Sequence, residues 1–233
     1  MKFKVYDEVF EILPDLCFGV VVAKDIDNSK QNPEIYKFMK ESMEALFNEL
    51  KDKDLKEYYK ITPYREAFKI LDINANKFMS SIEAMAKRVA KGNILPSINP
   101  IVDLGNSLSL KYVLPMGAHD LDALADEIAV RFSVKGDLFT PLGTEDIEIL
   151  EKGELVYADT KRIRTRRWIW RQSNVGCITE NSKNIFFPID GFALRNKDAI
   201  IDAMNELDGI LKEKFQCNTI IGFIDKNNKE IEL

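Results

Sequence analysis

The chain has 233 residues, of which 45% are hydrophobic and 30% are charged. This composition is typical of a globular protein and excludes disordered, collagen-like and membrane-spanning classes. The 33 Lys and Arg residues against 38 Asp and Glu residues give a formal net charge of -5. That balance argues against a protein that binds polyanions through its overall charge, although a local basic patch is compatible with it.

The titratable sulfur and imidazole groups are few. Cys17, Cys177 and Cys217 are scattered without a CxxC spacing and read as reduced thiols. With His119 as the single histidine, we expect no metal site and no cofactor. The N-terminus lacks a signal-peptide pattern, and no window approaches the roughly 18 uninterrupted apolar residues of a spanning helix. These features predict a cytoplasmic protein.

The first half of the chain predicts one buried strand and two helices. The apolar, β-branched run 17–23 predicts the strand, and the one-sided apolar pattern over 34–50 predicts an amphipathic helix. A charged stretch, 52–60, reads as a linker or helix end. Ser80 and Glu83 form a capping box for the second helix, whose C-terminal cap is Gly92.

The second half is richer in strands. Residues 101–114 mix apolar and polar types, and periodicity leaves open whether they form a helix or a strand. Alternation over 128–134 predicts a strand with one buried face. Three short runs, 155–158, 168–170 and 185–189, also predict strands.

A helix beginning at residue 198 and a final strand over 219–224 complete the predicted elements. Helices and strands follow one another in mixed order rather than in strict alternation. This order favours an α+β fold over a doubly wound parallel sheet.

Standard catalytic signatures are absent from the sequence: it contains no GxSxG, GxxxxGK[ST], GxGxxG or HExxH pattern. The first notable segment is 115–122, where His119 lies beside Asp120 and Asp122. His119 fits either a hydrogen-bonded turn residue or a proton-transfer group. Asp120 is also placed to cap a short helix.

The second notable segment, 161–172, combines a local concentration of positive charge with both tryptophans of the chain. Its basic residues are Lys161, Arg162, Arg164, Arg166, Arg167 and Arg171. If the segment is a strand, Trp168 and Trp170 share one face, while Arg167 and Arg171 share the other and line a common anionic pocket. The alternative is a charged strand with core tryptophans and arginines paired to nearby acids.

A further signal comes from short stretches that follow one another in a fixed order: 63–68, 81–84, 87–88, 91–92, 95–96 with 99, 101–106, 114–122, 130–131, 153–159 and 168–173. Together they resemble the B3/B4 domain of the bacterial phenylalanyl-tRNA synthetase β subunit. The resemblance is closer still to free-standing proteins made of that domain. It spans about residues 63 to 190 and is confined to the editing region, so no aminoacylation machinery is implied.

The resemblance implies a three-layer α+β domain, with a β-sandwich of unusual topology flanked by helices. Residues 1–233 are then a single domain, in which an N-terminal strand–helix extension and a C-terminal helix–strand pair pack on the core. It also implies a pocket that hydrolyses mischarged aminoacyl-tRNA. Such a second site supplies discrimination that one apolar pocket cannot. An activated ester needs a positioned water and oxyanion donors rather than a nucleophilic triad.

The carry-over of synthetase site residues is partial. Asn106 matches the asparagine that follows the Val-Asp pair, and Asp120 matches the aspartate of the Pro-Met-x-x-x-Asp motif. The synthetase histidine aligns with Gly117, and His119 lies two residues later. Both Asn106 and Asp120 are therefore expected in the pocket.

Two further departures concern substrate recognition. Residues 168–172 stand where the synthetase has a Gly-rich segment, and its substrate-reading glutamate falls near Pro188, with Asp190 the closest acid. The resemblance therefore does not carry tyrosine specificity over to this chain. A bulkier, more cationic pocket fits another amino acid or an acidic small molecule.

The favoured hypothesis is a protein that hydrolyses mischarged aminoacyl-tRNA in trans. The expected partner is aminoacyl-tRNA or an amino-acid-like small molecule. We expect neither DNA nor a membrane as a partner, and the sequence leaves the oligomeric state open. The alternatives are a non-catalytic RNA- or ligand-binding module and an unrelated small-molecule enzyme on the same fold. The expected residues are Asn106, His119, Asp120 and Gln172 for catalysis; Arg65, Trp168, Trp170, Arg171 and Asp190 for substrate binding; and Lys161, Arg162, Arg164, Arg166 and Arg167 for tRNA binding.

All of these hypotheses depend on one spatial expectation. The loop that carries His119 and the segment that carries the two tryptophans must meet in a single cleft, although they are far apart in sequence.

Overall fold

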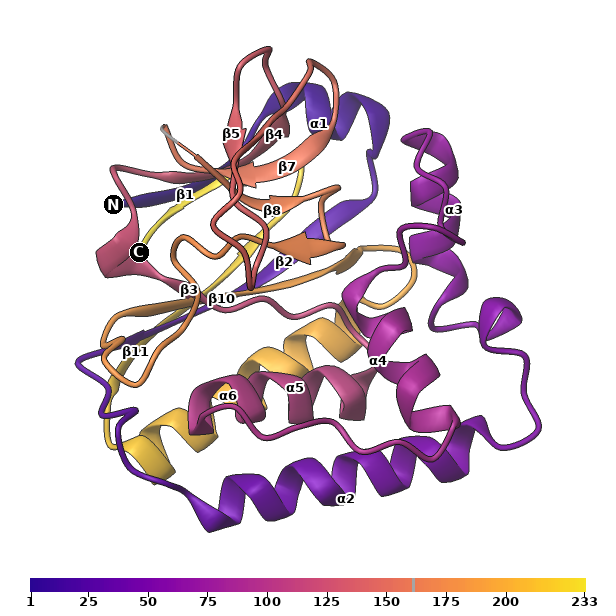
Figure 1. Cartoon of the computed structure of the whole chain (residues 1–233), viewed down its shortest axis with the longest axis vertical. Coiled ribbons are helices and arrows are strands. Elements are labelled where there is room, and N and C mark those ends of the chain that lie inside the picture. The colour runs from indigo at the N-terminus through magenta and orange to yellow at the C-terminus, as the bar shows by residue number, and fades with distance from the viewer. Residues whose placement is uncertain (161) are drawn as a thin grey trace.

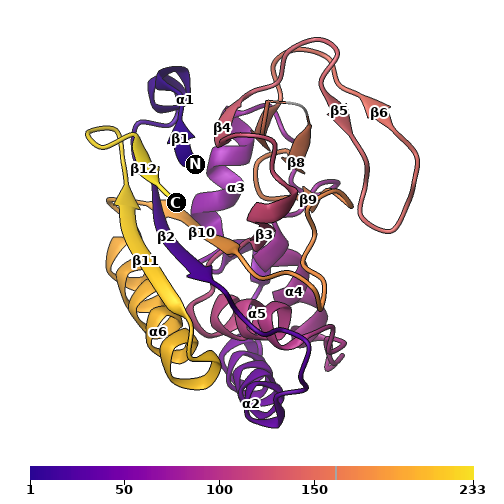
Figure 2. The ribbon, with the colours of Figure 1, turned by 90° about the vertical axis from the view of Figure 1, so that its left-hand side faces the viewer.

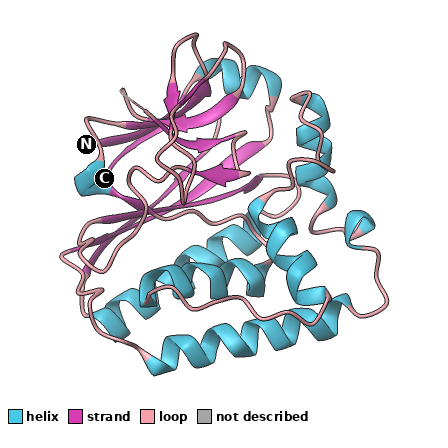
Figure 3. Ribbon diagram, viewed as in Figure 1, coloured by secondary structure: helices cyan, strands magenta, loops and turns pink. Residues whose placement is uncertain are grey.

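Helices and strands are layered in the computed structural model, which describes residues 1–160 and 162–233. Figures 1 and 3 show the strands on one side of the molecule and most of the helices on the opposite side. The α-helices are α1 (Asp7–Ile12), α2 (Pro33–Leu50), α3 (Thr62–Ile70), α4 (Ser81–Ala90), α5 (Pro100–Tyr112) and α6 (Lys197–Phe215). Two 3-10 turns are η1 (Leu55–Glu57) and η2 (Leu121–Ala123).

Three sheets hold the strands. A six-stranded sheet has the order β12 (Glu230–Glu232), β1 (Lys2–Val5), β4 (Ile128–Phe132), β7 (Leu155–Ala158), β8 (Ile163–Arg166), β9 (Arg171–Gln172). A four-stranded sheet has the order β11 (Asn218–Ile224), β2 (Leu16–Lys24), β10 (Ile185–Phe192), β3 (His119–Asp120). The small hairpin of β5 (Leu138–Phe139) and β6 (Glu148–Ile149) projects from the body, as Figure 2 shows.

The four-stranded sheet is the middle layer, because its central strands are buried on both faces. Alternate residues of β2 enter different hydrophobic clusters: Phe18 packs toward the six-stranded sheet, and Val21 packs toward the helices. Phe3 and Tyr157 of the six-stranded sheet fill the first cluster. Side chains from α2, α5 and α6 fill the second. The expected three-layer α+β architecture with a β-sandwich is therefore confirmed.

The two ends of the chain lie in the same sheet. β1 pairs in parallel with β4 and antiparallel with β12. The backbone N–H of Leu233 donates to the carbonyl of Met1 at 2.8 Å, and Figure 1 marks both termini at that edge. None of the helices in the described ranges has the length and apolarity required to cross a membrane.

Most predicted elements are confirmed. The run 17–23 lies in β2, the pattern over 34–50 lies in α2, and the undecided segment 101–114 is mostly α5. The Ser80 hydroxyl accepts a hydrogen bond from the N–H of Glu83 at 3.3 Å, which is the predicted cap of α4. Gly92, predicted as the C-terminal cap, follows the C-cap residue Lys91 and has a left-handed backbone, φ 75°.

Three predictions are wrong. Residues 168–170 are not a strand but belong to the turn that joins β8 to β9. β11 is not the last strand, because β12 follows it, and β4 ends at Phe132 rather than at residue 134. Local composition favours a strand at 168–170, but the backbone reverses there, with left-handed φ values of 47° at Arg167 and 58° at Trp168.

Candidate functional site

A cavity of about 80 Å³ lies where the β3 loop, β10 and the β8–β9 turn converge. The loop carrying His119 and the segment carrying both tryptophans therefore meet, as expected from the sequence. The predicted site residues that line this cavity are His119, Trp168, Trp170, Arg171, Gln172 and Asp190.

Backbone and side-chain hydrogen bonds fasten the three walls of the cavity. The Gln172 amide nitrogen Nε2 donates to the carbonyl of Ala118 at 2.7 Å and joins β9 to the His119 loop. The Gly117 N–H donates to the carbonyl of Pro188 at 3.0 Å, which joins the same loop to β10. The cavity is thus bounded by hydrogen-bonded backbone rather than by side chains alone.

Asp190 is the carboxylate of the cavity, and it is only 2% exposed. Its Oδ1 accepts hydrogen bonds from the Tyr157 hydroxyl at 2.7 Å and from the Trp168 indole Nε1 at 2.6 Å. Both donors are neutral, and no described residue forms an ion pair with it. Burial therefore raises the pKa of Asp190 to about 7, despite the two hydrogen bonds that lower it. Near neutral pH this carboxyl group exchanges its proton readily.

Trp168 reaches Asp190 from the turn between β8 and β9. Its indole is fully buried and packs against the rings of Tyr64, Phe68 and Phe192 at centroid distances of 6.3, 6.2 and 6.0 Å. Its backbone lies in the left-handed region, at a strain cost of about 1–3 kcal/mol for a non-glycine residue. The aromatic packing offsets that strain and fixes the indole N–H on the carboxylate.

His119 is buried beside the same cavity and is neutral. Its ring stacks on Tyr157 and Phe186 at centroid distances of 5.7 and 6.0 Å, and Nδ1 has no hydrogen-bond partner in the described part of the chain. Burial, with the charge of Arg164 second, lowers the pKa of His119 to about 3. The imidazole is therefore a weak base that presents a neutral hydrogen-bonding edge.

The imidazole of His119 lies close to the backbone of Gly117, the position at which the resemblance places the synthetase histidine. A Cβ atom at position 117 would lie only 3.3 Å from His119 Nε2. The imidazole therefore already lies against the space that a side chain at position 117 would enter.

Three predicted pocket residues lie outside the cavity lining. Arg65 pairs with Glu83 at 2.5 Å, and Asn106 sits half-buried on α5. Asp120 caps η2 by accepting from the N–H of Asp122 at 2.9 Å, as expected for a helix cap. Its other oxygen accepts from Ser182 at 2.5 Å. The structure gives Arg65 and Asp120 local structural contacts rather than contact with the cavity.

The arginines predicted to bind tRNA are largely occupied by acids. Arg164 is 2% exposed and forms an ion pair with Asp159. Arg166 pairs with Glu148 and, at 2.8 Å, with Glu154. Arg162 is half-buried, and Lys161 lies outside the described residues.

Arg167 and Arg171 do not share a pocket, so that prediction is wrong. Arg171 lines the cavity, whereas Arg167 pairs with Glu154 at 3.4 Å and lies over the ring of Phe78 at 3.8 Å from its centroid. The separation follows from the turn, because a reversed backbone removes the strand alternation on which the expectation rested.

Tyr157 was not singled out from the sequence, although it donates to Asp190 and stacks on His119. Within the apolar run 155–158 it reads as an ordinary core residue. Only the pairing of β7 beside β4 places its hydroxyl in the cavity.

The fold and cavity define an α+β domain built around a buried carboxyl group with neutral donors. Residues 63–206 match the family model of the B3/4 domain, which covers more than half of the chain. The chain therefore belongs to the B3/4 domain family.

Similar curated proteins are much longer than the matched region. The phenylalanine–tRNA ligase beta subunit of Idiomarina loihiensis is 38% identical over 105 residues, which are 45% of this chain and 13% of that subunit. The subunit of Fusobacterium nucleatum is 32% identical over 120 residues, 52% of this chain and 15% of that subunit.

One solved structure is an N-terminal fragment of the phenylalanyl-tRNA synthetase beta subunit from Pyrococcus horikoshii. It aligns with a TM-score of 0.49 and 12% identity, over 93% of this chain and 50% of that one. Within residues 1–160 and 162–233, no group of three or more His, Cys, Asp or Glu side chains is arranged to hold a metal ion.

Proposed function

We propose that this protein hydrolyses the ester bond of mischarged aminoacyl-tRNA in trans. The observation that carries the proposal is the cavity around Asp190, all of whose lining residues fall within the stretch 63–206 that matches the B3/4 family. Similarity to phenylalanine–tRNA ligase beta subunits supports a tRNA-linked substrate. We also propose one domain over 1–233, because β1 and β12 extend the sheet of β4, and a cytoplasmic location with no DNA partner.

In this proposal Asp190 is the general base. Its carboxylate takes a proton from a water molecule as the water oxygen attacks the ester carbonyl carbon, and the acyl C–O bond to the ribose then breaks. The ribose oxygen receives the proton from the Asp190 carboxylic acid, which leaves a free amino acid and an uncharged tRNA. A pKa near 7 suits both transfers. Gln172 and the neutral His119 hold the water and the carbonyl oxygen in place.

The decisive measurement is release of amino acid from a panel of mischarged tRNAs. We expect Asp190→Asn to lower kcat/KM by at least about 100-fold, the usual worth of a general base. For the wild type, kcat/KM should rise with pH through about 7, because the deprotonated carboxylate is the active form. Asp146→Asn, an exposed carboxylate of the β5–β6 loop, is the matched control. Hydrolysis no faster than buffer with every tRNA would contradict the proposal.

A non-catalytic ligand-binding module is the second candidate, and the size of the cavity favours it. About 80 Å³ is roughly half of the 150 Å³ that holds benzene in an engineered protein cavity, so a small amino-acid-like ligand fits better than an aromatic one. In that case Arg171→Ala, which removes a cation from the cavity lining, weakens binding of free amino acids measured by calorimetry, and no tRNA is turned over.

A further inference from the structure

Two stretches of this acidic chain hold an excess of positive charge, 51–91 and 161–172, and Arg164, Arg166 and Arg167 of the second are paired with acids. Residues 51–91 hold 10 Lys and Arg against 6 Asp and Glu, a net charge of +4, so the rest of the chain carries -9. The stretch includes η1, α3 and α4. Where cations of this stretch are exposed and form no ion pair, they can attract an anionic partner.

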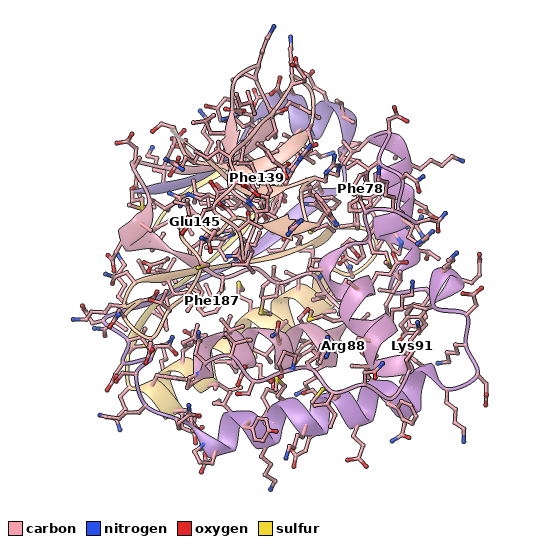
Figure 4. All side chains as sticks on the ribbon, viewed as in Figure 1. Phe78, Arg88, Lys91, Phe139, Glu145 and Phe187 are labelled. Carbon is pink, nitrogen blue, oxygen red and sulfur yellow. The ribbon has the colours of Figure 1, made fainter. Side chains whose placement is uncertain are left out.

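The cations at the end of α4 are available to such a partner. Lys87, Arg88 and Lys91 are exposed, and none forms an ion pair with a described residue. Arg88 donates only to the carbonyl of Ile94, at 3.1 Å. Figure 4 labels Arg88 and Lys91 together on the side of the molecule that α4 forms.

An aromatic pair lies where α4 begins. The rings of Phe78 and Trp170 meet edge to face at 4.8 Å, and the Arg167 guanidinium lies over both, at 3.8 and 4.7 Å from their centroids. Both rings are half-exposed, and Trp170 also lines the cavity. Rings and guanidinium planes of this kind stack with unpaired nucleobases.

The aromatic pair and the cations belong to one continuous surface. The N–H of Ser81, the first residue of α4, donates to the carbonyl of Ile169 in the β8–β9 turn at 2.8 Å. α4 has 10 residues, so its cationic end lies about 15 Å along the helix axis from the rim of the cavity. That distance spans a few nucleotides of single-stranded RNA.

We propose that a single-stranded RNA end binds along α4, with its phosphates on Lys87, Arg88 and Lys91 and its last base on the Phe78–Trp170 pair. The inference rests on the proposed function, and it names the surface that presents the ester to the cavity. It departs from the sequence-based expectation, which placed RNA on residues 161–167. Partly exposed rings at one end of α4 and unpaired cations at the other favour a nucleic acid, which has both bases and phosphates, over an anionic lipid surface.

Binding to a short single-stranded RNA with the sequence of a tRNA 3′ end tests the phosphate contacts. The triple variant Lys87→Gln, Arg88→Gln, Lys91→Gln should weaken binding at least about tenfold at low salt. It should also reduce the slope of log affinity against log salt by about 2, since each single-strand phosphate contact contributes about 0.7. The matched control changes Lys135, Lys183 and Lys226, exposed lysines in turns and loops elsewhere, to Gln. It should change neither quantity.

Tryptophan fluorescence tests the stacking contact. Trp168 is fully buried, so quenching by the RNA should come from Trp170 and disappear in Trp170→Phe. The proposal is overturned if the α4 triple variant and its control triple variant bind the RNA with equal affinity. It is also overturned if the double variant Arg162→Gln, Arg166→Gln loses more affinity than the α4 variant. It is also overturned if quenching persists in Trp170→Phe, or if phosphatidylserine vesicles bind more tightly than the RNA.

The binding assay separates this inference from the proposed function because it requires no turnover. If RNA binds along α4 but no ester is cleaved, the proposed hydrolysis is contradicted while the proposed binding surface is supported. If the wild type cleaves the esters and the α4 variant binds RNA and cleaves aminoacyl-tRNA as well as the wild type does, the proposed binding surface is contradicted while the proposed hydrolysis is supported.

Discussion

Two buried aspartates, Asp159 and Asp190, show how neighbours decide what a carboxyl group does. Asp159 is 3% exposed and Asp190 is 2% exposed, so water screens neither. Asp159 pairs with the guanidinium of Arg164 and also accepts from the backbone N–H of Arg162 at 2.7 Å. Among residues 1–160 and 162–233, the side-chain donors to the Asp190 carboxyl group are the neutral Tyr157 and Trp168.

The difference is one of charge compensation rather than of depth. A buried ion pair keeps its carboxylate ionised and holds the elements that carry the two partners together. A buried carboxyl group with neutral donors keeps a proton up to about neutral pH and can exchange it. The first arrangement, at the end of β7 in the six-stranded sheet, is structural, and the second, on β10 of the four-stranded sheet, is suited to chemistry.

Removing the cation from Asp159 should have the largest effect on stability. Arg164→Met removes the guanidinium that pairs with the buried Asp159 carboxylate, and we expect the free energy of unfolding to fall by about 3–5 kcal/mol. Urea denaturation measures the loss. The double variant Arg164→Met, Asp159→Asn removes both charges and should recover part of it. A loss below about 1 kcal/mol for the single variant would show that the pair is not structural.

Asp190→Asn should raise the free energy of unfolding above neutral pH, whereas Arg164→Met lowers it. The folded-state pKa of about 7 lies above the unfolded value of 3.8, so this group's stabilising contribution is complete below pH 3.8 and is lost as pH rises through 7. An amide mimics the protonated acid, so the variant should exceed the wild type by up to about 4 kcal/mol at pH 8 and match it near pH 4. Thermal unfolding across pH measures the difference; a gap that is constant with pH would exclude the raised pKa.

Tyr157→Phe should have the smallest effect on stability, and it tests what sets the raised pKa of Asp190. The Tyr157 hydroxyl lowers the pKa of Asp190, so its loss should move the titration midpoint of that carboxyl above 7. The hydrogen bond itself contributes about 1 kcal/mol to folding. Carboxyl NMR titration reports the midpoint. Tyr112→Phe, which loses a hydroxyl bonded to Glu206 instead, should leave it unchanged.

Local patterns in the sequence suffice for elements whose burial is regular. The helices α2 and α6 follow from one-sided apolar spacing, and Ser80 marks the start of α4. β12 escapes prediction because three residues, none of them buried, carry no periodic signal. The β8–β9 turn escapes because its bulky residues, Arg167 and Trp168, occupy a backbone region in which side chains of that kind are rare.

The candidate site is predictable in its parts but not in its electrostatics. His119, Gln172 and Asp190 can be singled out from motifs, and they do line one cavity. The sequence cannot show that Asp190 lacks a cation or that Arg164 has an acid, because both depend on contacts between strands distant in the chain. For Arg164, Arg166 and Arg167, the density of charge along the chain therefore overstates the charge that is free on the surface.

The hydrogen bond between Met1 and Leu233 bears on whether this fold can be inserted into another protein. Because the two ends meet at one sheet edge, the domain could be spliced into an exposed loop of a host without stretching either connection. Adjacent ends make such an insertion sterically simple, and they make circular permutation through a short linker equally practicable.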